Sequence, residues 1–136
     1  MTVVNLKPEI GVLRLSDTML NKYTIDANKS IRRCALMAGI DFDTMPNGHK
    51  DTLPCTLFYG SGAVADRLDT YINFYKTARG DRRVWINGFT PVTKGGDELH
   101  MTYERTGNGV FLVVNVTQVT KEALYHAETE RREQAQ

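Results

Sequence analysis

The sequence predicts an α+β fold: two helices, a C-terminal antiparallel meander of three strands, and short additional strands nearer the N-terminus. Apolar residues recur at helical spacing over residues 26–38 and again over residues 63–79. Beyond Gly80 the apolar residues alternate instead, which is typical of strands. The three strands of the meander are expected over residues 82–90, 97–105 and 109–119.

The N-terminal elements have recognisable end signals. A short strand is expected at residues 10–15, and Ser16 or Asp17 can cap the turn of helix that follows. The first full helix, residues 26–38, has one apolar stripe and stops at Gly39, a residue type that often ends helices. An irregular segment with the turn sequence Pro-Asn-Gly comes next.

A strand expected at residues 55–59 leads through a glycine-rich loop into the second helix. The apolar stripe of this helix consists of Val64, Leu68, Tyr71, Ile72 and Tyr75. Residues 106–109, Thr-Gly-Asn-Gly, are a good hairpin connection between the last two strands. The last strand is apolar on both faces, so we expect a helix or another subunit to cover its second face. A homo-oligomer is the expectation that follows.

Length and composition indicate one ordinary globular domain, with 136 residues, 41% of them hydrophobic and 24% charged. We expect the domain to span residues 1–126 and the polar residues 127–136 to form a flexible tail. The sequence shows no secretory signal pattern and no apolar run of about 18 residues. Two isolated cysteines form neither a disulfide framework nor a zinc site. We therefore expect a reduced cytoplasmic protein with no membrane contact, metal or other cofactor.

Charge is segregated along a chain whose net charge is only +1. Residues 22–39 carry four cations and one acid, residues 40–75 two cations and five acids, and residues 76–94 five cations and one acid. A protein with such blocks can present a positive face without a basic isoelectric point. Nucleic-acid phosphates are natural ligands of a positive face.

The strongest functional signal lies in residues 76–94, where basic side chains surround Trp85 and Phe89. On a strand that begins at Arg82, both rings share a face with Arg83, and aliphatic residues occupy the other face. Flat rings stack on unpaired bases and cations neutralise phosphates, so the segment favours binding of single-stranded nucleic acid. The predicted binding residues are Arg32, Arg33, Lys76, Arg79, Arg82, Arg83, Trp85, Phe89 and Lys94.

These features also have simpler structural explanations. Arg32 and Arg33 can form a solvated helix face, and the two rings can belong to the core or to a subunit contact. A protein-interaction module, such as a small viral factor that binds a host or phage enzyme, is the second hypothesis. It is motivated by the apolar last strand and by the polar tail, which could become ordered on a partner.

Catalytic motifs are weak. The three histidines lie in separate elements without further ligands at metal-binding spacing, and Gly-Ser-Gly is not a nucleophile elbow. A small enzyme that uses Asp41, Asp43 and His49 is the third hypothesis. We expect the protein not to be an enzyme.

The chain length, the order of helices and meander, the strand Arg-Arg-Val-Trp-Ile-Asn-Gly-Phe and the polar tail resemble a family of phage proteins. These are the small single-stranded-DNA-binding proteins of lytic bacteriophages, in particular the Drc type, which are cofactors of a phage-encoded RNA polymerase. The resemblance implies cooperative binding of single-stranded DNA, an oligomer, and a role in opening or stabilising promoter DNA for that polymerase. The alternative to a role in transcription is a role in replication, by coating single strands.

Overall fold

The structure is a computed structural model in which residues 10–60 and 66–117 are described. It contains one sheet of seven strands, in the spatial order β1-β6-β7-β3-β4-β5-β2. The strands are β1 (Gly11–Arg14), β2 (Ile25–Asp26), β3 (Lys50–Tyr59), β4 (Asp66–Lys76), β5 (Arg82–Ile86), β6 (Glu98–Thr106) and β7 (Gly109–Thr117). The helical elements are α1 (Asp17–Lys22), α2 (Lys29–Met37) and the short 3-10 turn η1 (Thr90–Val92).

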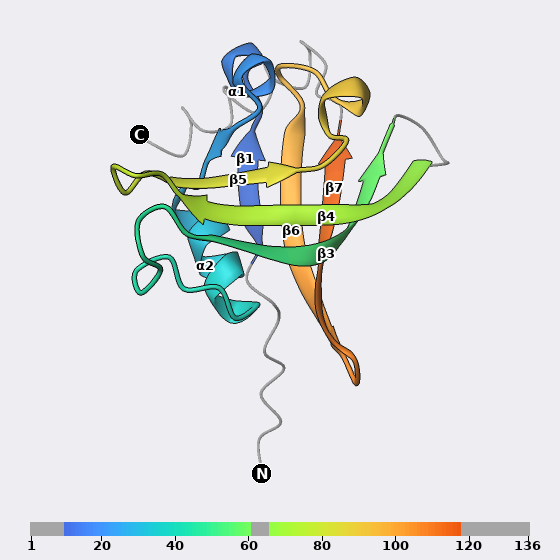
Figure 1. Ribbon diagram of the computed structural model, residues 1–136. Coiled ribbons are helices and arrows are strands. Elements are labelled where there is room, and N and C mark those ends of the chain that lie inside the picture. Colours follow the sequence, from blue (N-terminus) through green and yellow to red (C-terminus); the bar gives the residue numbers. More distant parts are fainter. Residues whose placement is uncertain (1–9, 61–65, 118–136) are drawn as a thin grey trace, which may run out of the picture.

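The sheet curls into a half-barrel (Figure 1). Strands β3, β4 and β5 cross the molecule at a steep angle to β1, β6 and β7. Neighbouring strands are antiparallel except β3 and β7, which run parallel from the pair Cys55–Leu112 to the pair Phe58–Asn115. The sheet is therefore mixed, and this parallel pairing joins its two halves.

Alternate residues of each strand point into the half-barrel and form the core. Leu57 of β3, Phe74 of β4 and Leu112 of β7 are all fully buried. Helix α2 packs against β1 and β6 on this inner side, where its buried stripe includes Ile31. The other face of the strands, which we call the outer face, carries the exposed and half-buried residues.

The free edge of β1 is closed by side chains from the start of α2. Val12 N–H donates to Ser30 Oγ at 2.9 Å, and Asn28 Nδ2 donates to the Val12 carbonyl at 2.9 Å. Asn28 also caps α2, because its Oδ1 accepts a hydrogen bond from Ile31 N–H at 2.9 Å. A free strand edge is a template for pairing with other chains, and these contacts occupy it at Val12.

The predicted α+β fold of two helices and a three-stranded meander is wrong. Among the described residues the protein is mostly β, with a seven-stranded curled sheet and only two short helices, α1 and α2. The predicted second helix, residues 63–79, is the main error, because its described part contains the eleven-residue strand β4.

The apolar residues of the segment 63–79 fit helical spacing, but those of β4 also fit the alternation of a strand. Leu68, Ile72 and Phe74 alternate with polar residues and tyrosines, and the latter two of these apolar residues are fully buried against the core. The centre of the segment, Thr-Tyr-Ile-Asn-Phe-Tyr, is rich in aromatic and β-branched residues, which favour strands. Ten ladder pairs with β3 then decide the conformation.

The meander is wrong in its pairing rather than in its strands. β6 and β7 form the expected hairpin, but β5 pairs with β4 and β2 and does not pair with β6. The short strand before Ser16 and the helix N-cap at Ser16 are confirmed, since Ser16 Oγ accepts from Met19 N–H at 3.2 Å.

The predicted tail, residues 127–136, lies outside the described residues. No helix in the described ranges is long and apolar enough to span a membrane.

Candidate nucleic-acid interface

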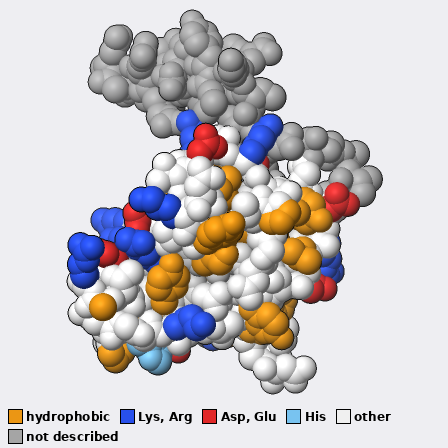
Figure 2. All heavy atoms as spheres, turned by 45° about the horizontal axis from the view of Figure 1, so that its top comes forward, with side chains coloured by type: hydrophobic (Ala, Val, Ile, Leu, Met, Phe, Trp, Pro, Cys, Tyr) orange, Lys and Arg blue, Asp and Glu red, His pale blue; other side chains and the backbone are white. Residues whose placement is uncertain are grey.

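The outer face of β3, β4 and β5 is an open surface that carries aromatic and polar side chains. β4 runs through its middle, paired with β3 on one side and with β5 on the other. The residues of β4 that alternate with its buried positions point to this face: Arg67, Asp69, Tyr71, Asn73 and Tyr75. Figure 2 shows apolar side chains spread over the centre of one face of the molecule.

Tyr71 is the most exposed aromatic side chain on these strands, with 55% of its surface accessible. The backbone around it is fixed, because its carbonyl accepts a hydrogen bond from Asn87 N–H at 3.0 Å. Next to it, Asn73 Oδ1 accepts from Thr52 Oγ1 at 2.8 Å, and Asn73 Nδ2 donates to Asn87 Oδ1 at 3.2 Å. The exposed ring therefore stands on a rigid, hydrogen-bonded platform.

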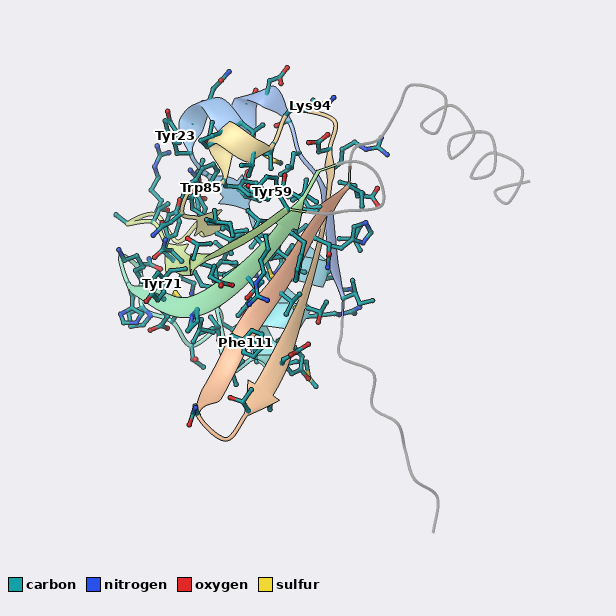
Figure 3. All side chains as sticks on the ribbon, turned by 90° about the vertical axis from the view of Figure 1, so that its right-hand side faces the viewer. Tyr23, Tyr59, Tyr71, Trp85, Lys94 and Phe111 are labelled. Atoms are coloured by element: carbon teal, nitrogen blue, oxygen red, sulfur yellow. The ribbon has the colours of Figure 1, made fainter. Side chains whose placement is uncertain are left out.

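Trp85 lies at the β5 end of the same face and is half-buried. It is in edge-to-face contact with Tyr23, at a centroid distance of 5.8 Å, and with Phe89, at 5.7 Å. Tyr23 itself is 63% exposed. Figure 3 shows Tyr23 and Trp85 close together, with Tyr71 farther along the sheet.

The predicted shared face of Trp85 and Phe89 is wrong for Phe89. β5 ends at Ile86, and the chain then turns, so the alternation that would place the phenyl ring beside Trp85 on the open face stops. Phe89 is only 1% exposed and belongs to the core. The aliphatic face was predicted correctly, because Val84 and Ile86 are both buried.

The two arginines at the start of β5 are held by carboxylates. Arg82 Nη2 lies 3.1 Å from Asp43 Oδ1. Arg83 Nη2 donates to Asp81 Oδ2 at 3.4 Å, and its Nε lies 3.3 Å from Asp26 Oδ1 without forming a hydrogen bond. Asp26 is the cross-strand neighbour of Arg83 in β2. A phosphate at either guanidinium would thus compete with an existing partner.

The fold brings three of the predicted cations together, with carboxylates between them. Arg32, Arg82 and Arg83 line one hollow of about 440 Å³, together with Asp26 and Asp81. Arg32 also lines a neighbouring hollow of about 180 Å³, whose walls are Lys29, Arg33, Leu36, Asp41, Phe42 and Asp43. Figure 2 shows such a mixed region, in which Lys and Arg side chains alternate with Asp and Glu. The cluster is therefore real, but it is not a bare positive patch.

The remaining predicted cations are dispersed. Lys76 Nζ donates to the Met45 carbonyl at 2.9 Å, and Arg79 is exposed in the turn between β4 and β5. Lys94 lies beside α1 at the top of the view in Figure 3, away from Tyr71. Its backbone N–H donates to Asp97 Oδ2 at 3.1 Å, which fixes the loop there.

Two further hollows lie on the outer face, one on each side of Tyr71 along β4. The smaller, about 250 Å³, is lined by Gly48, His49, Lys50, Asn73, Tyr75, Lys76 and Trp85. The larger, about 480 Å³, is lined by residues of β3, β4 and the β6–β7 hairpin, including Tyr71 and Phe111. The outer face thus offers rings and recesses in alternation.

Sequence reasoning missed Tyr71, Tyr75 and Asn73 as surface residues, because it placed them in a helix. The period of two in β4 was the available signal, since it separates these outward residues from Ile72 and Phe74. The alternation in the last strand did place Phe111 on the face opposite to Leu112. Nothing in the sequence indicated Tyr23, whose position depends on tertiary packing.

The residues of the enzyme hypothesis are engaged elsewhere. Asp41 Oδ1 accepts from Asp43 N–H at 2.9 Å, Asp43 pairs with Arg82, and His49 Nε2 lies 3.0 Å from Asp51 Oδ1. Within the described ranges no three His, Cys, Asp or Glu side chains are grouped so that they could hold a metal ion. Burial raises the pKa of Cys55 from 9.0 to about 12, so its thiol stays protonated at neutral pH.

Comparisons with known proteins identify no relative: no family model, no curated protein and no solved structure matches this chain.

Proposed function

We propose that the protein is a non-enzymatic binder of single-stranded nucleic acid, single-stranded DNA in the first instance, and that the outer face of β3, β4 and β5 is its binding surface. The observation that carries the proposal is the exposed ring of Tyr71, placed on a rigid strand between two recesses. Open sheets that present aromatic side chains are a recurrent solution for binding unstacked bases.

The energetic case rests on stacking. A base stacked on an aromatic ring contributes roughly 1–3 kcal/mol, and every base has a face to stack. Tyr71 has no ring partner among the described residues, so its accessible face is available to a ligand. Trp85 is already packed against Tyr23 and Phe89, and we assign it a smaller share of the stacking.

Phosphate binding requires exchange of ion partners. Arg82 and Arg83 are exposed enough to be solvated, with 39% and 30% of their side-chain surface accessible. Exposed ion pairs of this kind contribute only about 0–1 kcal/mol, so a phosphate can replace a carboxylate at little cost. Arg83 shares the outer face with Trp85, whereas Arg82, at the start of β5, lies on the side of Val84 and can only reach a nucleic-acid strand that passes over that end of the sheet. Exposed Lys50 lies on the outer face and has no ion partner among the described residues. We therefore expect moderate affinity that falls as salt rises.

The test compares a labelled single-stranded oligonucleotide with its duplex by fluorescence anisotropy at two salt concentrations. We expect tighter binding of the single strand and a decrease in its affinity at the higher salt. Tyr71→Ala should weaken single-strand binding by about 1–3 kcal/mol, or roughly five- to 150-fold.

Matched variants separate stacking from general damage. Tyr71→Phe keeps the ring and should bind like the original protein. Met37→Ala, on α2, removes a side chain that is 39% exposed but lies away from the outer face of the sheet, and should leave affinity unchanged. Absence of single-strand binding, or equal affinity for the duplex, would refute the proposal.

The resemblance to phage DNA-binding cofactors is the sole support for a role beside a phage-encoded RNA polymerase. Such a role, a cytoplasmic location in a host cell and the absence of catalysis remain part of the proposal. They are independent of the binding test above.

A second candidate, a protein contact such as a homo-oligomer interface, is favoured by β7. Phe111 and Val113 point to the outer face and are half-buried, and no described helix covers them. Val113→Asp should abolish an oligomer that uses this face, which light scattering after size-exclusion chromatography would detect. An unchanged mass would exclude this surface as the interface.

A further inference from the structure

The larger hollow on the outer face arises from the divergence of two strands. β3 pairs with β4 along its whole length, but with β7 only from Cys55 to Phe58. Before Cys55, β3 turns away from the β6–β7 hairpin, as Figure 1 shows. The wedge between them holds about 480 Å³, a size typical of sites for small molecules.

The wedge has flat apolar walls. Pro54 comes from β3, Tyr71 from β4 and Phe111 from β7. Figure 3 shows Tyr71 and Phe111 on these two separate arms of the structure. A planar heterocycle suits such walls, because both aromatic rings and proline offer flat apolar surface.

One polar group in the wedge has unused hydrogen-bonding capacity. Asp69 Oδ1 accepts from Thr56 Oγ1 at 3.2 Å and from Arg67 Nε at 3.1 Å. Asp69 Oδ2 accepts no hydrogen bond from the described residues, and the side chain is 68% exposed. The two bonds to Oδ1 fix the carboxylate, so Oδ2 is a positioned acceptor beside the apolar walls.

Arg67 gives the wedge a cation as well. Its guanidinium carbon lies 6.0 Å from the centre of the Phe58 ring, and its side chain is 60% exposed. Contact with Asp69 and with the ring holds the guanidinium on the outer face, where a phosphate joined to a base in the wedge could reach it.

We infer that the wedge between β3 and β7 is a base-selective pocket for one nucleobase that bears an exocyclic amino group, with Asp69 as the residue that reads it. The inference rests on the proposed function and adds selectivity to it. Cytosine presents an amino group at N4, adenine at N6 and guanine at N2, and a carboxylate accepts from such donors.

Thymine and uracil fit less well for an electrostatic reason. Their Watson–Crick edge has one N–H between two carbonyl oxygens, and those oxygens would face the negative carboxylate. A pair of hydrogen bonds that reads a base favours the correct base over a wrong one by about 1–3 kcal/mol. We expect a difference in binding free energy near 1 kcal/mol here, because Asp69 is exposed. This corresponds to about five-fold tighter binding of oligo-dC or oligo-dA than of oligo-dT.

The experiment measures anisotropy with labelled oligo-dC, oligo-dA and oligo-dT of equal length on the full chain. The original protein should prefer oligo-dC and oligo-dA over oligo-dT about five-fold, and Asp69→Asn should abolish that preference. The readout is the ratio of dissociation constants, because removal of a negative charge strengthens phosphate binding to every sequence alike.

Asp66→Asn is the matched control. It removes the same charge from the same strand, on the side opposite to Asp69, and should leave the ratio unchanged. Equal affinity for the three strands, or a preference that survives Asp69→Asn, would overturn the pocket while leaving single-strand binding intact. Loss of all binding would instead refute the proposed function, and the pocket with it.

Discussion

Tyr23 and Trp85 meet edge to face, with their ring centroids 5.8 Å apart and their planes at 84°. Tyr23 follows α1 and has a left-handed backbone conformation, with φ of 54°, whereas Trp85 lies near the end of β5. The contact therefore joins the end of α1 to β5, the neighbour of the edge strand β2, and partly shields the indole from water.

Replacing Tyr23 with alanine should expose the indole and loosen this junction. We expect a red shift of Trp85 emission and a loss of about 0.5–1.5 kcal/mol in the free energy of unfolding, the usual contribution of an aromatic pair. Emission spectra and urea denaturation measure the two effects. Tyr71→Ala is the matched control, since that ring is exposed and has no ring partner among the described residues, and it should shift neither the spectrum nor the stability appreciably.

The ion pair between Arg82 and Asp43 predicts a gain of binding from a surface substitution. Asp43→Asn releases the guanidinium and should tighten single-strand binding, with a salt slope steeper by up to about 0.7 for one newly neutralised phosphate. The unfolding free energy should change by less than about 1 kcal/mol, because the pair is exposed.

Asp66→Asn provides the control for Asp43→Asn. It removes one negative charge from the exposed first residue of β4, whereas Arg82 pairs with Lys76, the last residue of that strand. If both variants gain affinity equally, the effect is one of net charge, and the local role of Arg82 is excluded.

Local signals in the sequence correctly identified the start of α1 and the hairpin between β6 and β7. Ser16 caps α1 as predicted, and the Thr-Gly-Asn-Gly connection joins β6 to β7. These features depend on a few neighbouring residues, so short-range chemistry decides them.

Long-range pairing explains what the sequence could not show. β4 satisfied both a helical and a strand period, and its partners in β3 and β5 decided between them. Likewise the arginines of β5 could be counted in the sequence, but Asp43 and Asp26, which neutralise them, are far away along the chain. The charge of a segment therefore did not predict the charge of the surface that it forms.

The close approach of α2 to β1 makes Gly11 hard to replace. A methyl group there would lie 2.8 Å from Ile31 Cδ1 and 3.1 Å from Ile31 Cα. Ile31 is fully buried, so neither atom can move far. Gly11→Ala should lower the free energy of unfolding by about 1–3 kcal/mol, measured by urea denaturation.

A second glycine gives the comparison for Gly11. Gly107, in the β6–β7 turn, has no positive φ, and a methyl group added there would have no described atom within 4 Å. Gly107→Ala should change stability by less than about 0.5 kcal/mol. Equal effects of the two substitutions would show that crowding against Ile31 is not the cause.

Cys55 couples stability to alkaline pH. Burial raises its pKa from 9.0 to about 12, because the thiolate is disfavoured in the core. The folded state therefore holds this proton more tightly than the unfolded state. The stabilising contribution is complete below pH 9 and is lost as pH rises from 9 towards 12.

Urea denaturation at pH 7 and pH 10 tests this coupling by comparison of the original protein with Cys55→Ala. Between these pH values the original protein should lose about 1 kcal/mol more than the variant, since each pKa unit corresponds to about 1.4 kcal/mol. The comparison is needed because tyrosines and lysines also titrate in this range and affect both proteins alike. Equal losses in the two proteins would mean that the thiol ionises in the folded state as readily as in the unfolded one.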